Sequence, residues 1–259
     1  MMASMNPRID DWRARRVWVI GASTGIGAET AKHLLSLGAR VALSARSEVS
    51  LSAVANGHAQ AMVLPLDVTD AAQLAAARDR LLAEWQGIDL VLLVAGVYSE
   101  MRADSIDMKV VNRTLDVNLR GVFNGLDVVL PTLLSQRSGG IGIVSSVAGF
   151  RGLPRALAYG PTKAALINLA ESLYIDLQGR GVAVYLINPG FVDTPATKQN
   201  DFEMPALISA TDAAREIVQG MERGEFHIHF PKRFTNWLRF ARLLPYRLYF
   251  SLIHKVTGL

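Results

Sequence analysis

The chain has 259 residues, of which half are hydrophobic, and it contains no cysteine. It therefore forms no disulfide and no thiolate metal site, and it is long enough to bury the core of one α/β domain. No apolar run reaches the roughly 20 residues of a spanning helix, and residues 1–15 lack the apolar segment of a signal peptide. We expect a cytoplasmic protein that begins with a flexible lead-in.

Apolar runs alternate with helical patterns along the chain. Strands are predicted near 16–20, 40–45, 61–66, 89–95, 140–145, 182–188 and 226–230. Helices are predicted between them, with long ones near 106–135 and 157–179. The strand runs lack polar alternation, which is typical of parallel strands covered on both faces. This order predicts a single-domain α/β fold, a doubly wound, Rossmann-like parallel sheet of about seven strands that binds ligands at their carboxyl ends.

A glycine-rich turn follows the first predicted strand. The residues are Gly21-Ala-Ser-Thr-Gly25-Ile-Gly27, and a helical pattern begins at Ala28. Glycines in such a turn let the backbone approach a pyrophosphate and let the helix pack on the strand. Free N–H groups at the start of the helix bind phosphate. The turn therefore predicts a dinucleotide site.

The end of the second strand bears on the choice of dinucleotide. An acidic residue there would hydrogen-bond the ribose 2′-hydroxyl and repel a 2′-phosphate, whereas an arginine accommodates the phosphate. The position that would carry the acid is Ala45, and Arg46 follows it. A guanidinium without that acid favours NADP(H) over NAD(H). The alternative is that Arg46 merely caps the strand or pairs with Glu48.

A serine, a tyrosine and a lysine follow the fifth strand. Ser146 ends an apolar run, and Tyr159 and Lys163 share one face of a predicted helix because they are four residues apart. The lysine charge is expected to lower the phenol pKa from about 10, which would let the tyrosine exchange a proton near neutrality. A serine hydroxyl could hold a substrate carbonyl oxygen beside it. The gap to Tyr159 favours Ser146 over Ser145 for this role.

Together, the glycine turn and the Tyr-x-x-x-Lys pair resemble the short-chain dehydrogenase/reductase family in its compact single-domain branch, from about Val17 to Thr194. The resemblance implies a catalytic set of Asn118, Ser146, Tyr159 and Lys163, with Asn118 anchoring a water of the proton relay. It also implies that Asp67 lies beside the adenine ring. The predicted cofactor contacts are Gly21, Ser23, Thr24, Gly25, Ile26, Gly27, Arg46, Asp67, Val68, Ala95, Gly96, Tyr159, Lys163, Pro189, Gly190, Val192 and Thr194.

Two positions depart from the family pattern. Leu93-Val94 stand before Ala95-Gly96 where the family usually has two asparagines, which predicts a loss of hydrogen bonds between neighbouring strands. Thr24 stands where NADP(H)-dependent members often have a basic residue.

The C-terminal segment differs from the rest in composition. Phe226 to Leu259 contains no acidic residue, and its basic residues are Lys232, Arg233, Arg239, Arg242, Arg247 and Lys255. On a helix, Trp237, Phe240, Ala241 and Leu244 would share a face opposite Arg239 and Arg242. This pattern fits a helix in a membrane interface. The alternative, which we favour, is that the aromatic residues pack on a neighbouring subunit or cover the substrate pocket, with the arginines solvated.

We divide the chain into a lead-in (1–15), a dinucleotide-binding and catalytic domain (16–231) with a lid at about 193–212, and a basic, aromatic extension (232–259). His227 and His229 share a strand face but lack a third ligand, so no metal site is expected. Mixed charges outside the extension predict no nucleic-acid partner.

The favoured function is an NADP(H)-dependent oxidoreductase that interconverts a carbonyl and a secondary alcohol on an apolar small molecule. A homodimer or homotetramer is expected, with possible peripheral membrane contact through the extension. The alternative is a non-catalytic dinucleotide-sensing or scaffold protein on the same fold.

Overall fold

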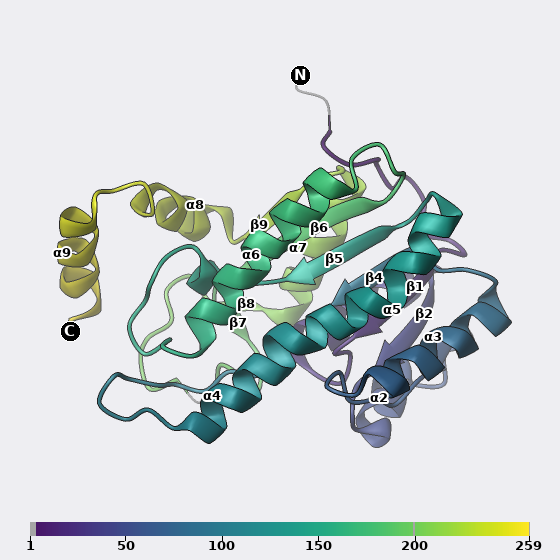
Figure 1. The fold of residues 1–259 in the computed structure, drawn as a ribbon, viewed down its shortest axis with the longest axis horizontal. Coiled ribbons are helices and arrows are strands. Elements are labelled where there is room, and N and C mark those ends of the chain that lie inside the picture. The colour runs from purple at the N-terminus through teal and green to yellow at the C-terminus, as the bar shows by residue number, and fades with distance from the viewer. Residues whose placement is uncertain (1–3, 199, 259) are drawn as a thin grey trace.

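The computed structural model describes residues 4–198 and 200–258, and within them seven strands form one parallel sheet (Figure 1). The strands of this sheet are β1 (Arg16–Ile20), β2 (Arg40–Ser44), β3 (Ala61–Val63), β4 (Leu90–Leu93), β5 (Gly140–Val144), β6 (Ala183–Pro189) and β9 (His227–Phe230). Their order is β3-β2-β1-β4-β5-β6-β9. The chain reverses its direction of winding between β1 and β4, so the carboxyl ends of these two strands border the crevice in which such sheets bind ligands.

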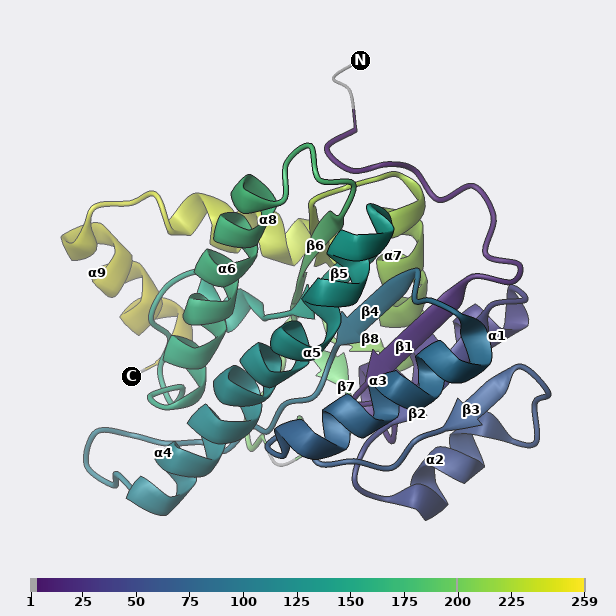
Figure 2. The ribbon, with the colours of Figure 1, turned by 45° about the vertical axis from the view of Figure 1, so that its right-hand side comes forward.

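Helices cover both faces of the sheet, as the near-continuous apolar strands require. One face packs against α1 (Gly25–Ser36), α2 (Glu48–Ala55) and α7 (Ala210–Glu222). The other packs against α3 (Ala71–Trp85), α5 (Gly121–Gln136) and α6 (Tyr159–Asp176) (Figure 2). The predicted doubly wound fold is therefore confirmed.

Most element boundaries agree with the sequence patterns, and two features differ. The long helix expected near 106–135 consists of α4 (Met108–Leu115), a π-helical turn η1 (Asp116–Arg120) and α5. Within the expected lid, the short strands β7 (Val192–Asp193) and β8 (Ile208–Ser209) pair with each other. Strands of two residues are too short to produce a recognisable pattern. Residue 199 of the lid lies outside the described residues.

The lead-in was expected to be flexible, and for residues 4–15 this is wrong. The Asn6 side chain donates to the Val184 carbonyl at 2.8 Å and accepts from its N–H at 3.2 Å, so it extends the hydrogen bonding of β6. Trp12 is buried, and its indole N–H donates to Glu222 at 2.9 Å. The polar composition predicted flexibility, but the side chains of Asn6 and Trp12 bind the segment to the domain. Residues 1–3 lie outside the described residues.

The extension forms two helices, α8 (Lys232–Ala241) and α9 (Tyr246–Thr257), and we call residues 232–258 the C-terminal arm. The residues of the expected apolar face are divided between the interior and the surface. Thr235, Leu238 and Ala241 are buried against the domain, whereas Trp237 and Phe240 are 38% and 66% exposed.

Arg239 and Arg242, expected opposite the aromatic residues, are exposed and also reach the domain. Arg239 donates to His229 at 2.9 Å, and the Arg242 guanidinium lies 5.8 Å from the Phe150 ring centre. None of the described helices is both long and apolar enough to cross a bilayer. Residue 259 lies outside the described residues.

Candidate active site

A cavity of about 450 Å³ opens at the carboxyl ends of the central strands. The predicted residues that line it are Gly21, Ser23, Thr24, Gly25, Ile26, Gly27, Arg46, Asp67, Val68, Ala95, Gly96, Ser146, Tyr159, Lys163, Pro189, Gly190, Val192 and Thr194. Of the predicted site residues, only Asn118 is not part of this lining. Segments far apart in the sequence meet here because parallel strands present their carboxyl ends at one edge of the sheet.

The glycine turn has the geometry that a dinucleotide phosphate requires. Gly21 has a φ of +104°, and a Cβ at that position would lie 2.4 Å from the Ala95 nitrogen. A Cβ at Gly27 would lie 2.1 Å from the Gly21 carbonyl oxygen. Thr24 precedes α1 without a side-chain cap, and the first turn of α1 has no acidic residue. The uncapped N–H groups and the positive end of the helix dipole therefore suit an anionic group.

Arg46 reaches the cavity from the end of β2. It is exposed, and among the described residues no carboxylate forms a salt bridge with it, so the alternative pairing with Glu48 is not seen. Asp67 lies near enough to interact electrostatically with this guanidinium. The Thr69 N–H and hydroxyl donate to Asp67 and, with a smaller contribution from Arg46, hold the pKa of that carboxyl below its usual range.

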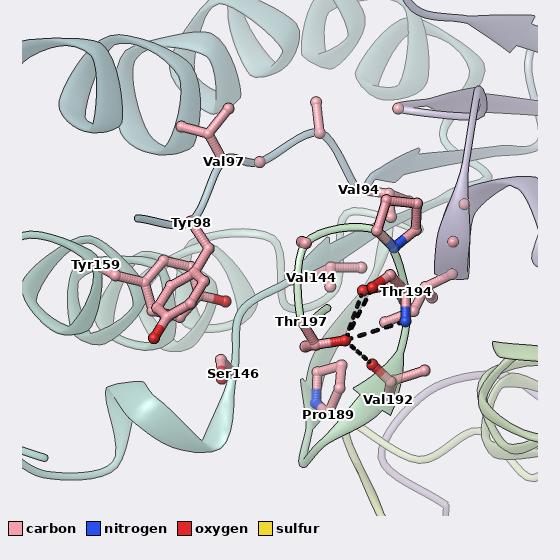
Figure 3. Close-up of a pocket in the computed structure, with 18 of the residues that line it drawn as sticks. Val94, Val97, Tyr98, Val144, Ser146, Tyr159, Pro189, Val192, Thr194 and Thr197 are labelled. Carbon is pink, nitrogen blue, oxygen red and sulfur yellow. Dashed lines mark hydrogen bonds between the residues drawn. The ribbon is translucent and has the colours of Figure 1, made fainter. Parts of the chain in front are cut away.

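Ser146 and Tyr159 lie together on the opposite side of the cavity (Figure 3). Ser146 precedes the short 3₁₀ turn η2 (Val147–Gly149), and its hydroxyl accepts from the Ala148 N–H at 3.1 Å. The Ser145 hydroxyl instead donates to the Lys163 carbonyl at 2.7 Å in the interior. This arrangement agrees with the choice of Ser146 over Ser145.

The expected lowering of the Tyr159 pKa is wrong for the protein by itself. Burial raises the pKa of Tyr159 to about 12, and a hydrogen bond with the Ser146 side chain offsets only part of this rise. The Lys163 ammonium donates to the Val144 carbonyl at 2.9 Å and lies 5.5 Å from the phenol ring centre. Burial also lowers the pKa of Lys163 to about 8. Spacing on a helix places the two side chains together but does not determine how far the protein desolvates them.

Asn118 lies in the π-helical turn and is completely buried. Its side-chain oxygen accepts from the Val97 N–H at 2.7 Å, and its side-chain nitrogen donates to the Val97 carbonyl at 2.9 Å. It thereby fixes the segment that follows β4. A π-helical turn of this kind is frequent at functional sites. The anchoring of a water by Asn118 stays a prediction.

The two residues that replace the family's asparagines take part in packing. Leu93 is buried against Gly125, where a Cβ would lie 2.8 Å from a Leu93 methyl group. The N–H groups of Val94 and Ala95 both donate to the Ile20 carbonyl at 2.9 Å. Main-chain hydrogen bonds therefore join the end of β4 to β1 without side-chain amides, and the Leu93 side chain packs β4 against α5.

Several apolar and aromatic residues of the cavity were missed in the sequence. These residues are Val97, Tyr98, Leu153, Phe191 and Phe202. The Tyr98 ring meets the Tyr159 ring edge to face, with ring centres 5.1 Å apart. The rings of Phe191 and Phe202 also meet edge to face, with centres 5.8 Å apart. Two of these positions offered a signal, because Tyr98 closely follows the Ala95-Gly96 pair and Phe191 lies between the predicted contacts Gly190 and Val192.

The cavity also contains an arginine that joins two loops. Arg155 forms ion pairs with Glu100, in the segment after β4, and with Asp201, in the lid. These groups are far apart in the sequence, so no local pattern could have predicted the contact.

The two histidines of β9 contribute to packing beneath α8. Arg239 can only donate, so the His229 Nε2 atom accepts from it, and the Nδ1 atom carries the proton shared with the Thr235 hydroxyl at 2.6 Å. Asn188 lies 2.8 Å from the His227 Nε2 atom. In the described part of the chain, no group of three or more His, Asp or Glu side chains is arranged to hold a metal ion.

Comparisons with known proteins identify the family. The family model for short chain dehydrogenases matches residues 15–204. An uncharacterized oxidoreductase of Myxococcus xanthus is 37% identical over 239 residues, covering 91% of this chain and 94% of that protein. One from Staphylococcus epidermidis is 34% identical over 204 residues, covering 78% of this chain and 89% of the relative.

A solved structure shares the fold. It is a short chain dehydrogenase/reductase from Burkholderia phymatum in complex with NAD, with a TM-score of 0.83 and 23% identity. The match covers 91% of this chain and 95% of the other. With the family match over most of the chain, these findings show that the protein belongs to the short-chain dehydrogenase/reductase family of NAD(P)-dependent oxidoreductases.

Proposed function

We propose that this enzyme uses NADP(H) to interconvert a carbonyl group and a secondary alcohol on an apolar substrate. The observation that carries the proposal is that the Ser146 hydroxyl and the Tyr159 phenol face the same cavity as the glycine turn. The nicotinamide supplies or accepts the hydride when it is bound. The protein then has to hold the substrate oxygen and move one proton.

The side chains divide this work between them. Ser146 holds the carbonyl oxygen through its hydroxyl, and Tyr159 donates a proton to it. Because burial raises the pKa of Tyr159 to about 12, the phenol is protonated at neutral pH and is ready to donate in the reducing direction. Lys163 binds the ribose and supplies positive charge beside the phenol. Asn118 supports the resupply of protons through a bound water.

Arg46 supports the preference for NADP(H). A planar guanidinium can bind a 2′-phosphate with two parallel hydrogen bonds, and no described carboxylate forms a salt bridge with Arg46. Neither Ala45 nor Ser47, the residues beside it in the cavity wall, is acidic. At the end of β2 the 2′-phosphate would therefore meet the Arg46 guanidinium, and neither residue beside it in the chain would repel the phosphate.

The walls beyond Tyr159 support an apolar substrate. Leu153, Phe191 and Phe202 line the cavity there, and Phe191 also contacts Phe234 at the start of α8 with ring centres 5.7 Å apart. Burial of an apolar group against these side chains would provide binding energy without hydrogen bonds. The two catalytic hydroxyls would then orient the carbonyl.

The test of the proposed function is a pair of matched substitutions. Tyr159→Phe keeps the ring and removes the proton donor, so kcat on a carbonyl panel should fall at least ~100-fold while NADPH binding is kept. Ser146→Ala should reduce kcat severely, whereas Ser145→Ala should have a mild effect. Undiminished turnover by the Phe variant would refute the assignment. A wild-type protein that binds NADPH but turns over no carbonyl would favour the non-catalytic alternative.

The proposal also includes two kinds of partner, a second copy of the chain and a membrane surface. The exposed apolar residues of α4–α6 form an isologous interface with a second copy, giving a homodimer or homotetramer. The outward face of α8 makes peripheral contact with an anionic membrane. The arm favours an anionic surface over its own copy, because an isologous contact would bring two basic segments without acidic residues together.

A further inference from the structure

The loop between Ser146 and Tyr159 contacts the C-terminal arm through residues 151–153. At its centre, the Arg151 guanidinium donates to the carbonyls of Arg242 and Leu244 at 3.1 and 2.6 Å. The same guanidinium lies over the Tyr246 and Tyr249 rings, 4.5 and 4.1 Å from their centres. Arg151 therefore contacts the end of α8, the linker and the first turns of α9 at once.

The next two residues of the loop also contact the arm. The Tyr249 hydroxyl donates to the Gly152 carbonyl at 2.7 Å. Leu153 packs against a small core formed by Ala241, Tyr249 and Ile253. Leu153 also lines the cavity, together with the three residues that follow it. One side of this loop is thus the wall of the cavity, and the other side is attached to the arm.

None of these contacts with Arg151 requires a carboxylate. The arm contains no acidic residue, so it offers Arg151 carbonyl oxygens and aromatic faces in place of a salt bridge. Stacking on aromatic rings and hydrogen bonding to carbonyls both suit a guanidinium better than an ammonium. At its far end the same loop is bound by Arg155, which pairs with Glu100 and Asp201.

We propose that the C-terminal arm is a positioning element for the substrate, with Arg151 as its positioning residue. By holding residues 151–153 of the loop, whose far end is held separately through Arg155, the arm sets the place of Leu153 and the rest of the substrate wall relative to Ser146 and Tyr159. The inference rests on the proposed function, because it takes that pair as the carbonyl-binding site. No residue of the described arm lines the cavity, so the arm acts on the substrate through the loop.

The experiment compares Arg151→Ala with Arg247→Ala. Arg247 is exposed on the same arm, and its side chain makes no ion pair or ring contact among the described residues. Arg151→Ala should raise KM for the best carbonyl substrate about tenfold with a smaller change in kcat, and should leave the Kd for NADPH unchanged. The Arg247 variant should match the wild type in all three.

A second readout does not depend on turnover. Hydrogen exchange of the amides of residues 150–156 should accelerate in Arg151→Ala and not in Arg247→Ala, with the glycine turn unchanged in both. Arg151→Lys should fail to restore slow exchange, because an ammonium cannot reproduce the stacked, forked contact. If Arg151→Ala does not fold, Tyr249→Phe removes only the hydrogen bond to Gly152 and tests the same contact.

Two outcomes would overturn the proposal. Loop exchange and KM that are unchanged in Arg151→Ala would show that the arm does not position the substrate wall, and equal effects of both arginine variants would show a general effect of charge. Failure of the proposed function looks different. In that case the wild-type enzyme turns over no carbonyl, while the exchange of residues 150–156 still responds to Arg151→Ala.

Discussion

At the level of a single side chain, we predict that Arg46 selects NADP(H) over NAD(H). Arg46→Ala should raise the Kd for NADPH and leave that for NADH nearly unchanged, because only the former has a 2′-phosphate. The loss of a charge-assisted hydrogen bond corresponds to about 1.5–3 kcal/mol, roughly a tenfold to hundredfold change in Kd. Fluorescence titration with both dinucleotides measures this. An equal loss for both would mean that Arg46 has a structural role.

His229 should make the stability of the fold depend on pH. Burial, together with the charges of Lys232 and Arg239, lowers its pKa to about 4, below the ordinary value of 6.5. The unfolded chain therefore takes up the proton first as the pH falls, and stability that is complete above pH 6.5 is lost towards pH 4. For this group the loss is on the order of 3 kcal/mol.

The measurement is urea unfolding at several pH values, with His229→Gln as the comparison. The amide can still donate to Thr235 and accept from Arg239, but it does not titrate. The variant should lose less stability than the wild type between pH 6.5 and 4.5. If the free energy of unfolding changes equally with pH in the two proteins, the prediction is wrong, whatever their absolute stabilities. Neighbouring His227, whose pKa burial lowers to about 3, should keep part of the dependence in both.

At the scale of elements, the outward face of α8 predicts binding to anionic lipid. Trp237, Phe240 and Leu243 are 38%, 66% and 74% exposed, and Arg233 and Arg247 on the same arm have no acidic residue of the arm beside them. Each cation near an anionic leaflet adds about 1 kcal/mol, and aromatic side chains anchor at the headgroup level. The full-length protein should therefore bind phosphatidylglycerol vesicles at low salt and release them at high salt.

Point substitutions test this face better than truncation. Removal of the arm would also take away Leu238 and Ala241, which are buried in the domain. Trp237→Ser with Phe240→Ser should weaken vesicle sedimentation, whereas Val49→Ser, at an 82% exposed apolar residue on α2, should not. A wild-type protein that ignores anionic vesicles at low salt would exclude the membrane proposal. A change of oligomeric mass in the double variant would indicate a second copy as the partner instead.

At the scale of the whole molecule, the exposed apolar surface of α4–α6 predicts self-association. Phe123 on α5 is 50% exposed and Ile175 on α6 is 70% exposed, in a protein whose other large apolar groups mostly lie in two cores. Light scattering at micromolar protein should give two or four times the chain mass of 28.2 kDa. Phe123→Asp should lower that mass with the fold intact. A monomeric wild type would refute the interface.

Much of this molecule follows from short-range patterns in its sequence. Apolar runs, the glycines after β1 and the four-residue spacing of Tyr159 and Lys163 are local features, so they predicted the order of elements and the residues at strand ends. Parallel pairing then brings those ends to one edge of the sheet, which is why nearly all the predicted residues line one cavity. The physical reason is that the helices and strands of this fold depend mainly on the pattern of residues close together in the sequence.

Tertiary structure decided what depends on contacts between distant residues. Asn6 bonds to Val184, Arg151 to the end of α8, and the pKa of Tyr159 rises because several segments together exclude water from it. The inward face of α8 likewise depends on the surface that it meets, so Leu238 and Ala241 are buried whereas Trp237 and Phe240 are exposed. No local pattern encodes these outcomes, because each depends on a partner that only the folded chain brings within reach.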